Sequence, residues 1–452
     1  MTKITLIDPL GSESGLFRHK HFFRDWSGAY TLGYIPFVPL DLLYAAAYLA
    51  KFGYQVEIVE ANIKHLEHKK VINLLKAGPA DFVFIPANYF SLNDDKYLAQ
   101  LIRESLPKIK IIFGGPPVTY NPALVLADGL ADFVALGEIE LPLLGILRGD
   151  VSRNIAYTNA EGVIVSGKRA LVNLDDLAIP ARNLIDNQAY RYAFFNKRNP
   201  VTAMSISRGC PHGKCKFCNA GLYTLGQMRY RNIASIAEEL HEIVFKYNIK
   251  EIFFRDQTFT ANRELVYALC ENIIRNNIDL LWRANTRVDL VDKELLALMR
   301  KAGCYQLSLG FESSSQNVLD TNEKGITLEQ SSQAARGCKE AGIEVLGNFM
   351  LGGLGDTVAT ARDLFRFVLE LDVDYANFNN YIHLPGTAIY DIYRDSRLPF
   401  LSGSVAKRYA TLYNLKFYFR PRILSRQLKK IRSFADLRFL FNVAINMLLP
   451  HG

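Results

Sequence analysis

Strand-like and helix-like segments alternate along most of this 452-residue chain, and this alternation limits its fold more than any other feature. Between residues 1 and 140, apolar runs such as ITLIDP and ADFVFIPAN alternate with amphipathic stretches such as LDLLYAAAYLAKF. A helix between two strands returns the chain to the same sheet edge, so successive strands lie parallel. The sequence therefore predicts an α/β fold that begins with a doubly wound, Rossmann-like parallel sheet.

A second series of strands and helices begins at Val201. It opens with TAMSISRG and closes with DYANFNNYIHLPG. It holds about six strand–helix steps, short of the eight in a full TIM-type barrel, so we expect a partial (β/α)6 barrel. The predicted organisation is a Rossmann-like domain, a linker, the partial barrel and a helical C-terminal region, with bounds 1–149, 150–198, 199–400 and 401–452.

Ligands of parallel sheets bind beyond the carboxyl ends of the strands. In the first domain this rule predicts site loops at residues 86–93, 114–120 and 137–140. The adjacent Gly114 and Gly115 either let a ligand approach the backbone closely or form a tight turn, and both interpretations stay open. No G-x-G-x-x-G motif is present, so nothing indicates a dinucleotide.

The positive charge of the chain is concentrated at its C-terminal end. The net charge is +8, but residues 401–452 hold ten Lys and Arg against one acid, so they carry +9 and the remainder carries −1. A basic end without a basic body argues against a nucleic-acid partner. At helical spacing, the tail lines up Leu437, Leu440, Phe441, Ala444 and Leu448. This helix either closes the barrel end or contacts a membrane surface beside a lipid-like substrate.

The rest of the composition indicates a protein of the reducing cytoplasm. No stretch of about 18 uncharged apolar residues and no signal segment is recognised, so no transmembrane helix is expected. Cys270, Cys304 and Cys338 are scattered singly, which is typical of buried thiols rather than of a disulfide framework.

The remaining three cysteines lie close together in RGCPHGKCKFCNAG. Cys210, Cys215 and Cys218 are spaced Cys-x4-Cys-x2-Cys, and a fourth thiol is missing. Structural zinc takes four ligands, and His212 would complete the set only by folding back into the loop. A [4Fe–4S] cluster held by three thiolates leaves one iron open to a substrate or cofactor. The alternative is a redox-inert loop with incidental cysteines.

The sequence around these cysteines resembles the radical S-adenosylmethionine (SAM) superfamily, in the branch with an N-terminal cobalamin-binding domain. SRGC leads into the cysteines, although the family's first gap is usually one residue shorter. FFRDQTFTANR, LSLGFESSSQNVLDTNEKGIT, FMLGGLGDT and LPGTAIY resemble successive barrel segments, and LGEIE resembles the GEGE segment that ends the cobalamin domain. The resemblance covers nearly the whole chain.

The resemblance implies three cofactors: a [4Fe–4S] cluster, SAM and cobalamin. In this superfamily one electron from the reduced cluster cleaves SAM to methionine and a 5′-deoxyadenosyl radical, which abstracts a hydrogen from the substrate. It implies that the cluster is bound by Cys210, Cys215 and Cys218. It implies a SAM site formed by Asp256, Gln257, Glu312, Ser313 and Asn348, with Met350 near the adenosyl group. It implies a cobalamin site formed by Tyr89, Phe90, Ser91, Gly114, Gly115, Gly137 and Glu138.

Two of the predicted SAM ligands could instead have a structural role. Glu312 could cap a helix at SSSQ, and Asp256 one at TANR. Arg283 and Arg287, on one face of a strand, could hold a carboxylate or pair with Glu312.

The histidine of a DxHxxG loop, which ligates cobalt in other cobalamin folds, is absent. His65 and His68 lie in IKHLEHKK, which is typical of a solvated helix start. Members of this branch often lack that histidine, so its absence leaves cobalamin as the expected cofactor.

The sequence thus predicts a radical SAM enzyme that acts on an unactivated carbon of a small organic molecule. Methyl transfer from methylcobalamin is the leading reaction, and radical cyclisation or rearrangement is the alternative. An iron–sulfur or zinc module for binding or electron transfer is the alternative outside enzymes. The expected partners are a small-molecule substrate, with a bulky or lipid-like molecule as one option, and an external electron donor of the flavodoxin or ferredoxin type.

Overall fold

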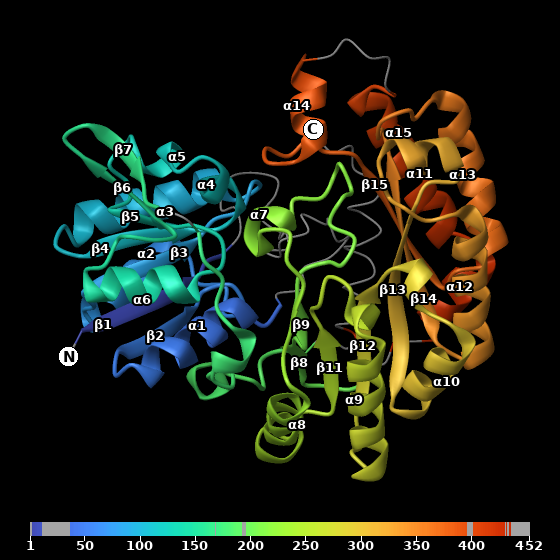
Figure 1. The fold of residues 1–452 in the computed structure, drawn as a ribbon, viewed down its shortest axis with the longest axis horizontal. Coiled ribbons are helices and arrows are strands. Elements are labelled where there is room, and N and C mark those ends of the chain that lie inside the picture. The colour runs from blue at the N-terminus through green and yellow to red at the C-terminus, as the bar shows by residue number, and fades with distance from the viewer. Residues whose placement is uncertain are drawn as a thin grey trace. The chain divides into compact units, whose positions relative to one another are not determined.

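The chain folds into two compact units in the computed structural model (Figure 1). The first unit comprises Met1–Tyr190 with Ala220–Arg231, and the second comprises Arg191–Asn219 with Asn232–Gly452. The short segment after the cysteine motif therefore belongs to the first unit. The structure describes residues 2–10, 37–167, 169–191, 196–395, 401–429, 431 and 434.

A seven-stranded sheet of order β2-β1-β3-β4-β5-β6-β7 forms the centre of the first unit. Five strands are parallel: β1 (Lys3–Asp8), β2 (Gln55–Glu60), β3 (Phe82–Pro86), β4 (Lys110–Gly114) and β5 (Phe133–Ala135). The predicted linker contributes two more, the antiparallel β6 (Ile155–Asn159) and β7 (Gly162–Val165). The order confirms the doubly wound sheet and places its switch point between β1 and β3, where ligands of such sheets bind.

Helices cover both faces of the parallel part of this sheet. They are α1 (Leu40–Lys51), α2 (His68–Ala77), α3 (Leu92–Ser105), α4 (Pro116–Tyr120), α5 (Ala123–Leu126) and α6 (Glu140–Arg148). On one face, α2 and α3 pack on Val83, Ile85 and Phe113. The expected solvated start of α2 is wrong for His68, which is 4% exposed and packs edge-on against Tyr97 at 5.5 Å, because α3 covers it. His65 is exposed.

The second unit is built on six parallel strands in the order β15-β14-β13-β12-β11-β8. They are β8 (Val201–Met204), β11 (Glu251–Phe254), β12 (Leu281–Thr286), β13 (Cys304–Glu312), β14 (Glu344–Leu351) and β15 (Tyr375–Asn380). The intervening helices are α8 (Ile233–His241, continued as a π-helical turn to Lys246), α9 (Arg263–Arg275), α10 (Lys293–Lys301), α11 (Gln316–Thr321), α12 (Leu328–Ala341) and α13 (Val358–Leu371). The predicted partial barrel is confirmed.

Alternation of side chains along the strands gives this barrel an apolar outer face and a polar inner face. In β12, Trp282 and Ala284 are buried in the core, whereas Arg283 and Asn285 are only half-buried. Successive side chains of a strand point to opposite faces, so the two pairs lie on opposite sides of the sheet. Helices α10, α12 and α13 cover the outer side (Figure 1). The inner side is left for polar chemistry.

Among the described residues, three helices follow the barrel: α14 (Ala388–Asp395), α15 (Gly403–Tyr418) and α16 (Pro421–Leu428). Helix α15 packs Tyr413 and Phe417 against Phe378 of β15, with ring centroids 5.6 and 6.3 Å apart. The helical C-terminal region is thus confirmed where the structure describes it. The apolar row predicted from Leu437 to Leu448 lies outside the described residues. Within the described ranges, no helix combines the length and apolarity needed to cross a membrane.

Candidate functional site

The three clustered cysteines lie in a loop that follows β8 and the short β9 (Ser207–Arg208). Cys210 and Cys215 are half-buried, and Cys218 is exposed. Gly209 and Gly213 adopt φ values of 110° and 61°, which side chains other than glycine rarely accept. The amide of Cys218 donates to the carbonyl of Cys215 over 3.0 Å, so the last two cysteines share one tight turn.

A second loop, residues 321–325, holds the cysteine loop in place. The backbone amide of Lys216 donates to the carbonyl of Asn322 over 3.1 Å, and its ammonium donates to the carbonyl of Thr321 over 2.9 Å. The imidazole Nε2 of His212 lies 2.6 Å from the carbonyl of Glu323, and its ring fills the space above Gly325. The longer first cysteine gap is therefore accommodated by this packed histidine.

Two cations lie near the thiols. Arg287 pairs with Asp289 at 2.8 Å and donates to the carbonyls of the 321–325 loop, so the suggested pairing with Glu312 is wrong. Burial raises the pKa of the Cys215 thiol to about 11, and the positive charges of Lys324 and Arg287 oppose this rise. Iron binds the thiolate form, which these charges stabilise.

These thiols fit an iron–sulfur cube better than a single ion. Among the described residues, no three His, Cys, Asp or Glu side chains converge as ligands of one metal ion. A cubane cluster attaches each thiolate to a different iron, so its ligands need not converge on one point. The three thiols do not converge on one point, and they lie near positively charged side chains that stabilise thiolates, so they are compatible with such a cluster.

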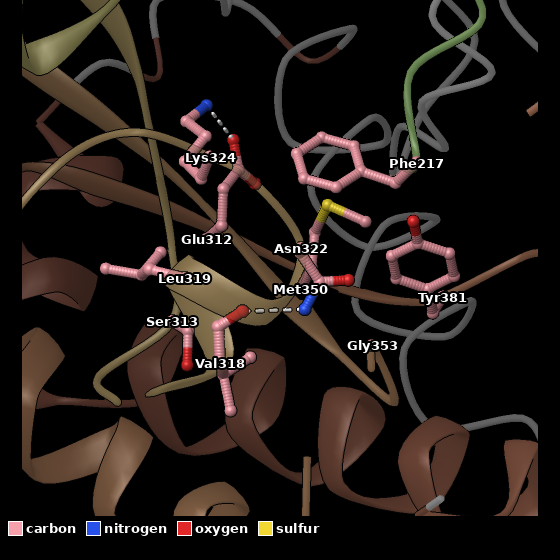
Figure 2. Close-up of a pocket in the computed structure, with 10 residues that line it drawn as sticks. All are labelled: Phe217, Glu312, Ser313, Val318, Leu319, Asn322, Lys324, Met350, Gly353 and Tyr381. Carbon is pink, nitrogen blue, oxygen red and sulfur yellow. Dashed lines mark hydrogen bonds and ion pairs between the residues drawn. The ribbon is translucent and has the colours of Figure 1, made fainter. Parts of the chain in front are cut away.

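A small cavity of about 20 Å³ lies beside the cysteine loop (Figure 2). That volume accommodates a water molecule or a group of similar size. It is lined by Phe217, Glu312, Ser313, Val318, Leu319, Asn322, Lys324, Met350, Gly353 and Tyr381. The structure therefore brings together Glu312, Ser313 and Met350 from the predicted SAM set, and adds Lys324 and Tyr381, which the sequence analysis missed.

Glu312 and Lys324 form a buried ion pair in this cavity, with Oε1 and Nζ 2.7 Å apart. Their side chains are 13% and 9% exposed. Burial lowers the pKa of Lys324, but the negative charges of Glu312 and Cys215 together hold that pKa above its ordinary value. Glu312 is not a helix cap, because the hydroxyl of Ser315 accepts the amide of Val318 at the start of α11. One carboxylate and one ammonium thus line the same small space.

Tyr381 follows β15 and contributes a buried hydroxyl. The residue is 5% exposed, and its hydroxyl has no hydrogen-bond partner among the described residues. Its ring packs edge-on against that of Phe217, with the ring centroids 6.0 Å apart. Figure 2 shows the two side chains next to each other. Phe217 lies between the last two cysteines, so this contact links the end of β15 to the cysteine loop. A hydroxyl buried without a partner is costly unless a ligand satisfies it.

Asp256 is buried at the end of β11, where its carboxylate accepts the amide of Ile206 and the hydroxyl of Ser207. Burial raises its pKa to about 6, and these hydrogen bonds lower it in part. The capping alternative is wrong, because Asn262 caps α9. Asp256 therefore ties β11 to the strand that leads into the cysteine loop, and the neighbouring Gln257 is exposed.

Asn348 lies on the inner face of the barrel and is not among the residues that line the cavity. Its amide nitrogen donates to the hydroxyl of Ser308 over 2.8 Å, and its oxygen accepts from Asn377 over 3.2 Å. These bonds make a polar row across β13, β14 and β15. Arg283, also on the inner face, lies 4.7 Å from the ring of Phe253.

The predicted cobalamin residues lie in loops that follow three adjacent parallel strands. These residues are Tyr89, Phe90 and Ser91 after β3, Gly114 and Gly115 at the end of β4, and Gly137 and Glu138 after β5. Gly115 adopts φ 117°, and a Cβ there would lie 2.0 Å from the carbonyl oxygen of Ala87. The backbone of Ala87, in the loop after β3, thus occupies the space beside Gly115. This close approach of two loops supports the interpretation of the glycines as a tight turn.

Side chains from other segments of the first unit hold the loop after β5 in place. The amide of Gly137 donates to the hydroxyl of Thr119 over 3.1 Å, and the guanidinium of Arg169 occupies the position of a side chain at Gly137. Glu138 pairs with Arg229, which also donates to the carbonyl of Val172 over 2.6 Å. The three loops lie at the carboxyl ends of adjacent parallel strands, which is where ligands of such sheets bind.

Comparison with known proteins identifies both units. Residues 204–368 match the radical SAM superfamily, and residues 34–147 match the B12-binding domain. An uncharacterized methyltransferase from Pyrococcus horikoshii is 27% identical over 414 residues, 85% of this chain and 89% of the relative. An anaerobic magnesium-protoporphyrin IX monomethyl ester cyclase from Rubrivivax gelatinosus is 28% identical over 391 residues, 83% of this chain and 69% of the relative.

A solved structure shows the same fold. The cobalamin-dependent S-adenosylmethionine radical enzyme OxsB, with aqua-cobalamin and S-adenosylmethionine bound, matches 99% of this chain and 72% of its own, with a TM-score of 0.76. Its sequence identity is 16%, so the likeness concerns the fold alone.

The cysteine loop at the barrel and the matched domain define this chain as a radical SAM enzyme. Within that superfamily it belongs to the branch with an N-terminal cobalamin-binding domain. The two domains use a [4Fe–4S] cluster, SAM and cobalamin, which confirms the three cofactors expected from the sequence.

Proposed function

We propose that this enzyme transfers a methyl group to an unactivated carbon of a small organic substrate. Its likeness to the Pyrococcus methyltransferase over most of both chains carries the proposal. When bound, the cluster and SAM supply radical chemistry and cobalamin supplies the methyl group, while the protein binds, orients and shields the reactants. The electron comes from an external donor of the flavodoxin or ferredoxin type.

The water-sized cavity beside the cysteine loop would receive one charged group of the amino-acid end of SAM, and the rest of that end would lie outside it. That end carries one ammonium and one carboxylate, and the cavity presents Glu312, Lys324 and the hydroxyl of Tyr381. Glu312 would accept from the ammonium, and Lys324 and Tyr381 would donate to the carboxylate. The 2.7 Å ion pair keeps both buried charges compensated before SAM arrives. Ser313, which is 6% exposed, lies beside Glu312 in the same lining.

The proposal is tested with SAM that carries a deuterated methyl group. The full chain, reconstituted anaerobically with iron, sulfide and cob(I)alamin, should form deuterated methylcobalamin and S-adenosylhomocysteine. With a low-potential reductant it should also release 5′-deoxyadenosine, and Cys215→Ala should abolish this release. Cys270→Ala, which alters a fully buried thiol outside the loop, is the matched control.

Radical cyclisation without methyl transfer is the second candidate, and the likeness to the Rubrivivax cyclase favours it. It predicts 5′-deoxyadenosine without S-adenosylhomocysteine and without deuterium in cobalamin. That outcome would contradict methyl transfer and retain radical SAM chemistry. If wild type and Cys215→Ala both form no 5′-deoxyadenosine above background, both candidates fail.

A further inference from the structure

We infer that the hydroxyl of Thr258 donates a hydrogen bond to the cluster ligand Cys210 and thereby raises the reduction potential of the cluster. The Oγ1 of Thr258 lies 3.4 Å from the Sγ of Cys210. Thr258 is 1% exposed, so water does not compete for this hydroxyl. Among the described residues, this hydroxyl has Cys210 as its hydrogen-bond partner. The inference rests on the cluster, and so on the radical chemistry proposed above.

The position of Thr258 is determined by the chain around it. Two residues earlier, Asp256 accepts from Ile206 and Ser207, which directly precede the cysteine loop. The carbonyl of Thr258 accepts the amide of Ala261 over 3.2 Å, which fixes the turn after β11. Asp256 and Thr258 thus attach the end of β11 to the cysteine segment at two points. The hydroxyl is oriented by backbone that cannot easily move away from the sulfur.

A donor at a ligand sulfur acts on the two oxidation states unequally. Reduction adds one electron to the cluster and increases the negative charge on its sulfurs, so the hydrogen bond stabilises the reduced state more. Stabilising the reduced state raises the potential. Lys324 and Arg287 act in the same direction near Cys215 through their charge. Thr258, by contrast, is uncharged and donates to a different cysteine, Cys210. Its hydroxyl can therefore be removed without altering the net charge of the site.

The test is an anaerobic redox titration of the reconstituted full chain without SAM, followed by the electron paramagnetic resonance signal of the reduced cluster. Thr258→Val keeps the shape of the side chain and removes the donor. At a given solution potential, its ratio of reduced to oxidised cluster should fall about tenfold, a shift of about 59 mV to lower potential for a one-electron couple. Thr258→Ser should titrate close to wild type.

Thr260→Val is the matched control, because it removes a buried hydroxyl that contacts Thr286 instead of a cysteine. If Thr258→Val and Thr260→Val titrate at the same potential, the inference is wrong. If Thr258→Val holds too little iron to titrate, the smaller Thr258→Ala is titrated in its place, with the same shift expected. Failure of wild type to assemble any cluster would instead contradict the proposed function.

Discussion

Tyr381 shows how a single side chain can mark a ligand site. Its hydroxyl is buried in the cavity and has no partner among the described residues. Tyr413, by contrast, donates to the carbonyl of Ala361 over 2.7 Å. A protein tolerates an unsatisfied buried donor where a ligand later accepts from it. The spacing of the cysteines contains no information about this residue.

Replacing Tyr381 with Phe should weaken SAM binding. The variant loses one hydrogen bond to the charged carboxylate of bound SAM, worth about 1.5–3 kcal/mol, so the Kd should rise at least about tenfold. The Kd is measured by anaerobic equilibrium dialysis on the reconstituted enzyme. Tyr413→Phe, which removes a structural hydroxyl, should bind SAM like wild type. Equal Kd values for both variants would contradict the assignment of Tyr381.

Asp256→Asn should change how stability depends on pH. Burial raises the pKa of Asp256 to about 6, above the value of about 3.9 in an unfolded chain. The folded state therefore binds the proton of Asp256 more tightly than the unfolded chain does. The stability that this proton adds to the folded state is fully present below about pH 3.9 and is lost as the pH rises through about 6. Between these limits, wild type should lose about 3 kcal/mol of unfolding free energy relative to the variant.

Urea unfolding of both proteins from pH 4 to pH 7 measures this difference. Asp128→Asn, at a carboxylate whose side chain is 61% exposed, should run parallel to wild type. If the unfolding free energy of Asp256→Asn also changes with pH in parallel with that of wild type, the pKa of the Asp256 carboxyl is not raised in the folded state.

At the scale of elements, the barrel strands position the cysteine loop through the 321–325 loop. That loop leaves α11 and contacts His212 and Lys216, more than a hundred residues earlier in the chain. Gly325 is essential to this contact, because it adopts φ 66° and a Cβ there would lie 2.5 Å from the ring of His212. The cysteine loop is one residue longer than is usual in the family, and Gly325 leaves the space that its His212 occupies.

Gly325→Ala should therefore reduce iron incorporation. The added methyl displaces His212, and with it the segment between Cys210 and Cys215. Gly342→Ala is the matched control, because its φ is 72° but its nearest neighbour would lie 3.7 Å away. Both variants carry a similar backbone strain of about 1–2 kcal/mol. Iron per chain after reconstitution should fall only in Gly325→Ala and recover in part when His212→Ala is added.

At the scale of the whole molecule, each unit has its own hydrophobic core. The first centres on residues such as Phe113, and the second on residues such as Phe311, both fully buried. Separate cores mean that damage to one unit should remain largely within it.

Phe113→Ala should destabilise the first unit by about 3–5 kcal/mol, since the cavity it leaves cannot collapse fully. Amide exchange should accelerate in β3 and β4 but not in β13, and cobalamin retention should fall while iron incorporation persists. Phe311→Ala should give the reverse pattern. Hydrogen exchange with mass spectrometry, together with cobalt and iron analysis, measures both. Equal acceleration in both units in either variant would contradict separate cores.

The sequence by itself determined the parallel sheet, the partial barrel and the three-thiol loop. Those features depend on local periodicity and on chain order, which act over a few residues. Only the tertiary structure decided which side chains meet. Thr258 reaches Cys210, Lys324 pairs with Glu312, and Asp256 supports a strand instead of capping a helix. Such partners come from separate segments, so their distances depend on how whole elements pack, which no local pattern records.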